Sequence, residues 1–424
     1  HVQPIRMRAL STEYLAILFA CGLGPLACMA YYLGRKKGKT LHREEGGAPL
    51  SQPDIYGWYA LVWMILPVIG VFILVFLLHL SGLISIPESV LIPGASTAAV
   101  AGLALALKQI HPRLRARQRL ERVIYWLLFV AALISILTTI GIVLSVVFEA
   151  VKFFRVVSSW EFITGSEWSP DTAFLQGAER AGEEAAKPQF GSLPIFAGTF
   201  MITFIAMCVA IPVGLFSAIY MSEYASGPIR AVAKPALEIL AGIPTVVYGF
   251  FAAITVSPLV VRLAASLGLE ADYTNALSPG LVMGIMIIPF ISSLSDDVIR
   301  SIPQSLREGS LALGLTVSET IKHVLLPAAL PGVISAFLLG VSRALGETMI
   351  VVMAAGLRPN LTMNPLEGMT TVTVRIVDAL TGDLAFDSLE TLSAFALGLT
   401  LLLITLMLNL ISTLVIRKFK QKYE

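Results

Sequence analysis

The stretch VIYWLLFVAALISILTTIGIVLSVVF, residues 123–148, decides the class of fold, because it runs for 26 residues without a charged side chain. A helix needs roughly 20 apolar residues to cross the hydrocarbon core of a bilayer. The whole chain shares this character: of its 424 residues, 56% are hydrophobic and only 14% are charged. Soluble domains carry roughly 25% charged residues. The sequence therefore predicts an all-α polytopic membrane protein.

Eight further apolar blocks bring the expected number of transmembrane helices to about nine. Lipid offers no hydrogen-bond partner to exposed backbone groups, so each block is expected to be helical throughout. The predicted spans are 12–33, 56–80, 89–107, 123–148, 196–220, 237–257, 279–295, 328–356 and 392–416.

The distribution of Lys and Arg predicts the orientation of the chain, because positively charged loops remain in the cytoplasm. One set of alternate loops carries 20 basic residues, whereas the opposite set carries nine. The richer set is expected in the cytoplasm and consists of 35–43, 108–122, 223–236, 296–326 and the tail from Arg417. The C-terminus is thus predicted inside and the N-terminus outside.

Several classes of function are excluded by composition. The three cysteines all lie in apolar blocks, so neither a disulfide framework nor a zinc site is expected. The five histidines are scattered without metal-ligand spacing. A net charge of +2 indicates no nucleic-acid partner. Since Ser, His and Asp form no recognisable catalytic order either, the sequence indicates neither an enzyme nor a cofactor bound by this chain.

The predicted cytoplasmic loop 296–326 is longer than the other basic loops and is amphipathic. Its centre, residues 307–314, reads REGSLALG and ends on a glycine that can adopt a positive φ and terminate a helix. Thr316 and Glu319 then stand at capping-box spacing, which predicts that a second helix starts there. Pro327 is expected to stop or kink this helix before the next span. Docking into a partner and lying at the membrane surface both fit this pattern.

The spacing from Glu308 to Pro327 resembles the "EAA" loop of ABC importer permeases. That pattern reads Glu-Ala-Ala, three residues, Gly, nine residues, Ile-x-Leu-Pro, and the chain departs from it at Gly309, Ser310 and Val324. The resemblance implies that loop 296–326 is the coupling region that sits on a separate ATPase subunit. The coupling residues implied in this way are Glu308, Gly309, Ser310, Gly314, Leu326 and Pro327.

Further motifs between residues 120 and 424 resemble phosphate-specific importers, and the first two resemble the C-type permease more than its A-type partner. They are Trp168-Ser-Pro170, Phe190-Gly-Ser-Leu-Pro194, Gly198-Thr199, Pro212, Ser222-Glu-Tyr-Ala225, Gly242-Ile-Pro-Thr-Val-Val-Tyr-Gly249, Ser295-Asp-Asp-Val-Ile-Arg300 and Arg343-Ala-Leu-Gly-Glu-Thr-Met349. On these motifs the chain is identified as a member of the binding-protein-dependent transport inner membrane component family.

The resemblance implies the type I permease fold of ABC importers and a multi-pass protein of the bacterial cytoplasmic (inner) membrane. It further implies a second, A-type permease, two ATPase subunits that carry ATP and magnesium, and an extracytoplasmic phosphate-binding protein. The expected domains are an accessory membrane region at 1–118, a first core helix and long outer loop at 119–195, and the permease domain at 196–424.

Arg343 and Glu347 are the candidate residues of the substrate pathway. They stand four apart in an otherwise apolar predicted span, which would place both on one helical face. A charge at the bilayer centre costs about 2.5–3.5 kcal/mol on insertion scales, so such residues usually face a cavity or a partner. Arg343 can offer a planar fork to an oxyanion while Glu347 competes for it, and the family resemblance supports this role. A buried pair that only fixes helix packing is the structural alternative.

The function expected from these observations is that of a permease subunit of an ATP-driven phosphate importer. Two alternatives stay open: a permease for another oxyanion such as sulfate or molybdate, and a membrane anchor or sensor that moves no substrate. The pair Arg343 and Glu347 discriminates against the anchor, because a scaffold has no use for charges in mid-membrane.

Overall fold

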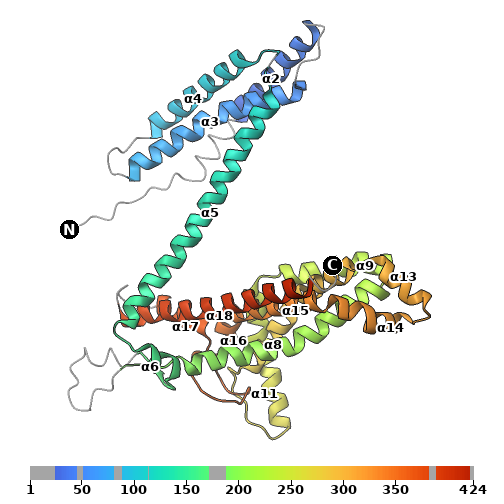
Figure 1. Ribbon diagram of the computed structural model, residues 1–424. Helices are drawn as coiled ribbons and strands as arrows, with labels where there is room; N and C mark the ends of the chain where they lie inside the picture. The colour runs from blue at the N-terminus through green and yellow to red at the C-terminus, as the bar shows by residue number, and fades with distance from the viewer. Residues whose placement is uncertain are drawn as a thin grey trace, which may run out of the picture. The chain divides into compact units, whose positions relative to one another are not determined.

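The computed structural model describes residues 24–44, 51–80, 88–112, 114–170, 188–381 and 388–420. These residues are mostly helical (Figure 1). They fold as two compact units that divide between Ile140 and Gly141. The beginning of the first predicted span lies outside the described residues.

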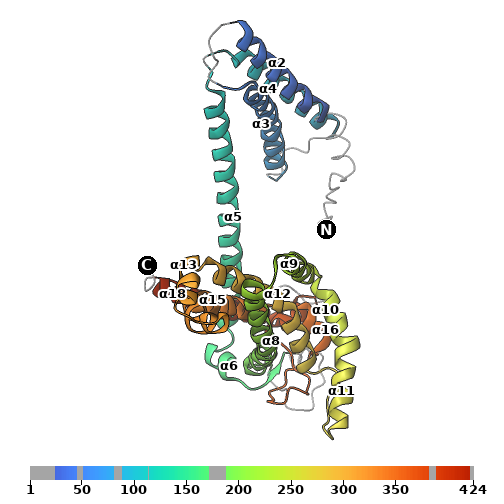
Figure 2. The same ribbon diagram turned by 90° about the vertical axis from the view of Figure 1, so that its right-hand side faces the viewer.

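Three helices build most of the first unit: α2 (Gly24–Glu44), α3 (Pro53–Leu80) and α4 (Glu88–Gln109). Both α2 and α4 pack on α3 (Figure 2). Glycines permit this close approach, because a methyl group at Gly34 would meet the carbonyl oxygen of Tyr56, and one at Gly102 that of Trp63. The apolar run 123–148 lies inside α5 (Ala116–Phe154), a single helix of 39 residues.

The second unit is a longer series of helices with one pair of short strands. Its first half consists of α6 (Ser159–Thr164), β1 (Trp168–Ser169), β2 (Gln189–Phe190), α8 (Leu193–Ile219), the π-helical turn η2 (Tyr220–Tyr224), α9 (Gly227–Gly242), α10 (Thr245–Phe251), η3 (Ala252–Val256) and α11 (Ser257–Ser266). Its second half consists of α12 (Leu277–Ser301), α13 (Gln304–Ala312), α14 (Val317–Thr320), η4 (Ile321–Leu325), α15 (Leu326–Leu345), α16 (Met349–Ala354), α17 (Val372–Thr381) and α18 (Leu389–Lys420).

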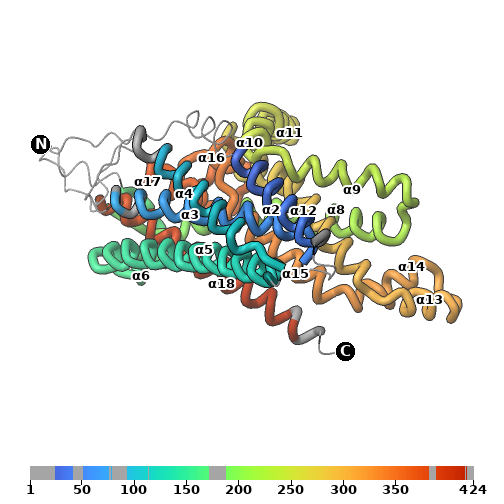
Figure 3. Tube along the Cα trace, turned by 90° about the horizontal axis from the view of Figure 1, so that it is seen from above, coloured from blue at the N-terminus to red at the C-terminus, as the bar shows by residue number. Residues whose placement is uncertain are grey.

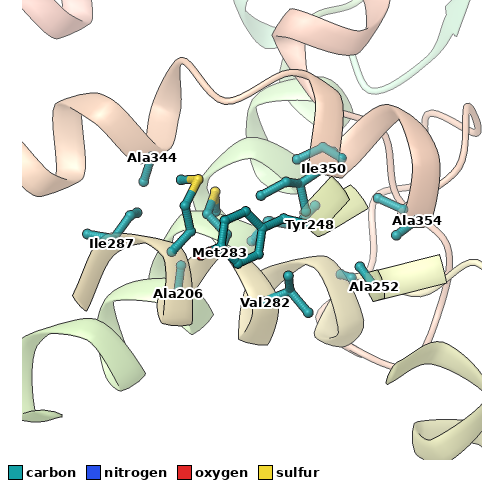
Figure 4. Packing of buried hydrophobic residues seen from close by; sticks show 14 of the residues in the cluster. Ala206, Tyr248, Ala252, Val282, Met283, Ile287, Ala344, Ile350 and Ala354 are labelled. Atoms are coloured by element: carbon teal, nitrogen blue, oxygen red, sulfur yellow. The ribbon is translucent and has the colours of Figure 1, made fainter. Parts of the chain in front are cut away.

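The core of the second unit forms where α8 packs along α12. Gly284 is the contact that brings them together, because a Cβ atom there would lie 2.9 Å from the carbonyl oxygen of Ala206. Met283 and Ile287 of α12 are fully buried, and Tyr248 and Ile350 join the same cluster from α10 and α16 (Figure 4). The small-residue pair Gly280 and Gly284 thus serves helix packing, as its spacing indicates.

An aromatic cluster closes one end of the second unit. Phe162 and Phe190 each pack edge to face against Phe153, at centroid distances of 5.6 and 5.4 Å. Trp168 joins them through Phe190, because β1 and β2 pair in antiparallel register.

Seven helices in the described residues are long and apolar enough to cross a membrane, and five of them match predicted spans closely. These seven are Pro53–Val75, Ala116–Phe154, Leu193–Tyr224, Thr245–Ser266, Leu277–Ser301, Val317–Leu345 and Leu389–Val415. The predicted span 89–107 corresponds to α4, and the described part of span 12–33 belongs to α2. The polytopic all-α class is therefore confirmed.

The predicted span 237–257 is wrong in its limits. Residues 237–242 belong to α9, and the membrane-length helix begins at Thr245 and continues to Ser266. The reason is Pro244, whose ring disfavours helical backbone at the residue before it. Ile243 is extended there, with φ −66° and ψ 129°.

Candidate functional site

Helices α13 and α14 form a hairpin at one end of the second unit (Figures 1 and 3). Gly314 adopts φ +87° between them, in the left-handed region that glycine tolerates best. The second helix starts with a capping box: Thr316 Oγ1 accepts the Glu319 N–H, and the Glu319 carboxylate accepts the Thr316 N–H at 2.8 Å. The predicted helix, glycine turn and second helix are thus confirmed.

The sequence predicts that Pro327 stops or kinks the second helix, and the structure shows that the helix does not stop there. The chain passes from α14 through η4 directly into α15, and Pro327 occupies the first turn of α15. A proline removes one helical donor, and a π-helical turn absorbs the irregularity, here with the Leu326 N–H donating to the Ile321 carbonyl. The hairpin is therefore continuous with a membrane-length helix.

The predicted coupling residues occupy two kinds of position. Glu308, Gly309, Gly314 and Pro327 are exposed, and Leu326 is half-buried. Ser310, in contrast, is buried, and its hydroxyl lies 3.0 Å from Thr320 Oγ1 and so ties α13 to α14.

Apolar side chains also project from the hairpin into its surroundings. Leu313 is 83% exposed at the tip. The other large apolar side chains exposed on the hairpin are Leu306, Leu311 and Val317. Grouped apolar exposure of this kind marks an interaction surface.

Arg307 anchors the hairpin to the membrane helices, and the sequence analysis missed this role. Its guanidinium donates to the carbonyl oxygens of Ile299 (2.7 Å) and Ile302 (2.8 Å) at the end of α12. It also pairs with the carboxylate of Glu223 in η2 at 3.2 Å, and both side chains are largely buried. The motif Ser222-Glu-Tyr-Ala225 was the available signal, since it places a carboxylate beside a predicted membrane boundary.

Asp296 is the second feature that the sequence analysis did not single out. Its side chain is fully buried in α12 and accepts a hydrogen bond from Arg230 of α9 at 2.7 Å. Two further cations surround it, with Lys234 at 3.6 Å and Arg300 at 3.4 Å. A buried carboxylate needs such partners, because an unpaired charge in the interior is strongly destabilising. The cluster therefore fastens α9 to α12.

A cavity of about 250 Å³ lies beside this cluster, and Arg343 of α15 lines it. Charged walls are supplied by Lys234 and Glu238 of α9 and by Asp296. Pro289 and Phe290 of α12 complete the apolar side. The Arg343 guanidinium carbon lies 5.6 Å from the centroid of the Phe290 ring, a cation–π distance.

Glu347 does not lie on one helical face with Arg343, so that part of the prediction is wrong. Helix α15 ends at Leu345, and α16 begins only at Met349. In this break the Glu347 carboxylate accepts the Met349 N–H at 3.2 Å, and its carbonyl accepts the Thr373 hydroxyl at 2.8 Å. Arg343 and Glu347, both described, form no ion pair within 4.0 Å. The predicted span 328–356 is accordingly two helices.

Irregular backbone at membrane depth is tolerated only where it is buried in protein or lines a cavity. The break at residues 346–348 is held by Thr373 of α17, which is itself buried.

No cluster of metal-ligating side chains occurs among the residues that the structure describes.

The family described as "Binding-protein-dependent transport system inner membrane component" matches residues 210–421, half of the chain. The chain belongs to this family and is a multi-pass inner-membrane permease subunit, not an enzyme. A second family, described as "Phosphate ATP-binding cassette transporter", matches residues 21–102 in the first unit.

Two relatives from Bacillus subtilis and Mycobacterium tuberculosis agree with this membership. The "Probable ABC transporter permease protein YqgH" of Bacillus subtilis is 34% identical over 66% of this chain and 85% of its own length. The "Phosphate transport system permease protein PstC 1" of Mycobacterium tuberculosis is 31% identical over 70% of this chain and 92% of its own. A solved bacterial ABC transporter involved in the import of alginate aligns with 72% of this chain and 99% of its own, at 15% identity and a TM-score of 0.47.

Proposed function

We propose that this chain is a permease subunit of an ATP-driven phosphate importer and forms the translocation pathway with a second, A-type permease. The observation that carries the proposal is the guanidinium of Arg343 in a cavity beside a broken membrane helix. Phosphate is supported by the family matched in the first unit and by the phosphate permeases among the relatives.

Arg343 suits the recognition of an oxyanion. A guanidinium is always charged and presents its donors in a plane that matches two oxygens of a phosphate. Glu347 lies in the break after α15, where its carboxylate accepts the Met349 N–H and, among the described residues, forms no ion pair. When the gate moves, Glu347 competes with phosphate for Arg343 and prevents permanent trapping of the anion.

The α13–α14 hairpin is the surface for the ATPase partner. Its exposed apolar side chains provide the contact, and Arg307 connects it to α12 and η2. ATP and magnesium would bind to two ATPase subunits, and an extracytoplasmic phosphate-binding protein would deliver the substrate. Movement of the hairpin would reach the cavity through α12, which contributes Pro289, Phe290 and Asp296 to its wall.

Radiolabelled phosphate uptake by proteoliposomes that contain the whole complex tests the proposal. Uptake should require ATP and the binding protein, and Arg343→Gln should abolish it while assembly stays normal. Arg262→Gln, in the membrane helix α11, is the matched control and should transport normally. Wild-type uptake by Arg343→Gln would remove this residue from the pathway.

Sulfate and molybdate serve as competitors in the same assay. Inhibition of uptake by either anion at the concentrations effective for unlabelled phosphate would favour a permease for another oxyanion. A complex that assembles but moves none of these anions would favour the anchor or sensor.

A further inference from the structure

The pathway proposed above rests on one cation, yet the cavity beside Arg343 contains a second. Lys234 lines the same cavity from α9, so the two positive groups face it from different helices. A volume of about 250 Å³ accommodates a tetrahedral oxyanion together with some of its water. The Lys234 side chain is 34% exposed, so solvent and ions can reach it.

Lys234 is bound less tightly to Asp296 than Arg230 is. Its ammonium lies 3.6 Å from Asp296 and 3.6 Å from Asp297, both longer than a good charge-assisted hydrogen bond. Arg230 is bound much more tightly, because it donates to Asp296 at 2.7 Å and to the Met221 carbonyl at 3.0 Å. Asp296 thus keeps Arg230 and Arg300 when Lys234 moves away.

The charge balance of the cluster also favours an anion. Arg230, Lys234 and Arg300 surround the carboxylates of Asp296 and Asp297, so the cations exceed the anions by one. Glu238, which is exposed, and Arg343 add one charge of each sign to the cavity wall. An anion that enters can therefore attract Lys234 without leaving a buried carboxylate unpaired.

The cavity lies toward the cytoplasmic side by the expected orientation. Lys234 belongs to a basic loop of the cytoplasmic set, 223–236, and Met221 lines the cavity next to the turn that contains Glu223. That turn is tied to the α13–α14 hairpin through Arg307.

We infer that Lys234 forms an inner binding site for the transported oxyanion. Phosphate that leaves Arg343 binds next to the ammonium of Lys234, which then moves away from the carboxylates of Asp296 and Asp297. When the phosphate is released, Lys234 pairs with these two carboxylates again. This inference rests on the proposed function, since it requires that Arg343 handle the substrate. Beyond the proposed function, the inference adds a contact between phosphate and Lys234 on α9 and a binding step before release into the cytoplasm.

The test uses proteoliposomes with the complete complex, the binding protein and labelled phosphate outside, and ATP with magnesium inside. Only complexes whose ATPase subunits face the lumen are then energised. Unlabelled phosphate inside should occupy the inner site by mass action and slow uptake. The quantity measured is the luminal phosphate concentration that halves the uptake rate.

Three variants give distinct expectations. Lys234→Gln should raise the half-inhibiting concentration roughly tenfold, the weaker end of the effect of a charge-assisted hydrogen bond. Asp297→Asn removes an exposed competitor of the anion and should lower that concentration roughly twofold to fourfold. Lys36→Gln, an exposed lysine in α2, is the matched control and should leave it unchanged.

The inference is overturned when the half-inhibiting concentration of luminal phosphate is the same for Lys234→Gln, Lys36→Gln and the wild type. If Lys234→Gln fails to assemble, the result for Asp297→Asn tests the inference instead. A half-inhibiting concentration equal to that of the wild type in Asp297→Asn then overturns the inference. If Arg343→Gln abolishes uptake in the same experiment, the proposed function survives that outcome. Wild-type uptake by Arg343→Gln instead overturns both.

Discussion

Breaking the contact between Arg307 and Glu223 should uncouple the hairpin from the membrane helices. Arg307 donates to Ile299 and Ile302 and pairs with Glu223, and the two charged side chains are only 14% and 12% exposed. Removing one partner leaves the other charge poorly solvated, so Arg307→Met should destabilise the unit by about 2–3 kcal/mol. At roughly 2–4 °C per kcal/mol, the midpoint of thermal unfolding should fall by about 4–12 °C.

A double-mutant cycle isolates the pair. Glu223→Gln, Arg307→Met and the double variant are compared by thermal unfolding of the purified complex, and a coupling of about 1–3 kcal/mol is expected for residues in one network. Arg117→Met is the matched control, because its ion pair with Glu121 lies in the open at 73% and 58% exposure. An exposed pair of this kind contributes at most about 1 kcal/mol.

The functional readout is the number of ATP molecules hydrolysed per phosphate taken up in proteoliposomes. This ratio should rise in Arg307→Met while the ATPase subunits remain bound, because the hairpin no longer moves α12 with it. Two results refute the reasoning: single-variant effects that simply add in the double variant, or an unchanged ratio in an assembled complex.

Three further changes test other parts of the same unit. Gly314→Ala places a side chain on a backbone at φ +87°, which costs about 1–2 kcal/mol in the folded hairpin, and should therefore weaken retention of the ATPase subunits on the purified permease. Gly227→Ala, where a methyl group meets no described atom within 4 Å outside its own helix, is the control, and equal retention by the two variants contradicts the role of the turn. Thr316→Val removes a cap and should cost about 1 kcal/mol in thermal unfolding, with an unchanged midpoint counting against the capping box. Gly284→Val should cost about 1–3 kcal/mol by pushing α8 from α12, whereas Gly141→Val should not, because a Cβ atom there meets no described atom within 4 Å outside its own helix.

Local patterns in the sequence predict the local structure of this chain well. The run 123–148 forms one helix because, without water in the lipid, its backbone N–H and C=O groups must hydrogen-bond to one another. The hairpin also follows from nearby residues, since Gly314 needs no neighbour to adopt positive φ, and Thr316 and Glu319 cap each other across three residues. These interactions close within one turn, so spacing along the chain reveals them.

The candidate site needed contacts between distant residues. The spacing of Arg343 and Glu347 suggests one helical face. In the structure, however, the Thr373 hydroxyl of α17 donates to the Glu347 carbonyl oxygen and stabilises the break between α15 and α16. Lys234 and Asp296 are 62 residues apart and meet only because α9 packs on α12.

By itself, therefore, the sequence determined the membrane class, most helices and the hairpin. Only the tertiary structure decided which charges share a cavity and where a membrane helix breaks. The physical reason is that hydrophobic burial in lipid and helix capping depend on neighbours in sequence. A buried charge, in contrast, is stabilised only by whichever partner the packing of other helices brings within reach.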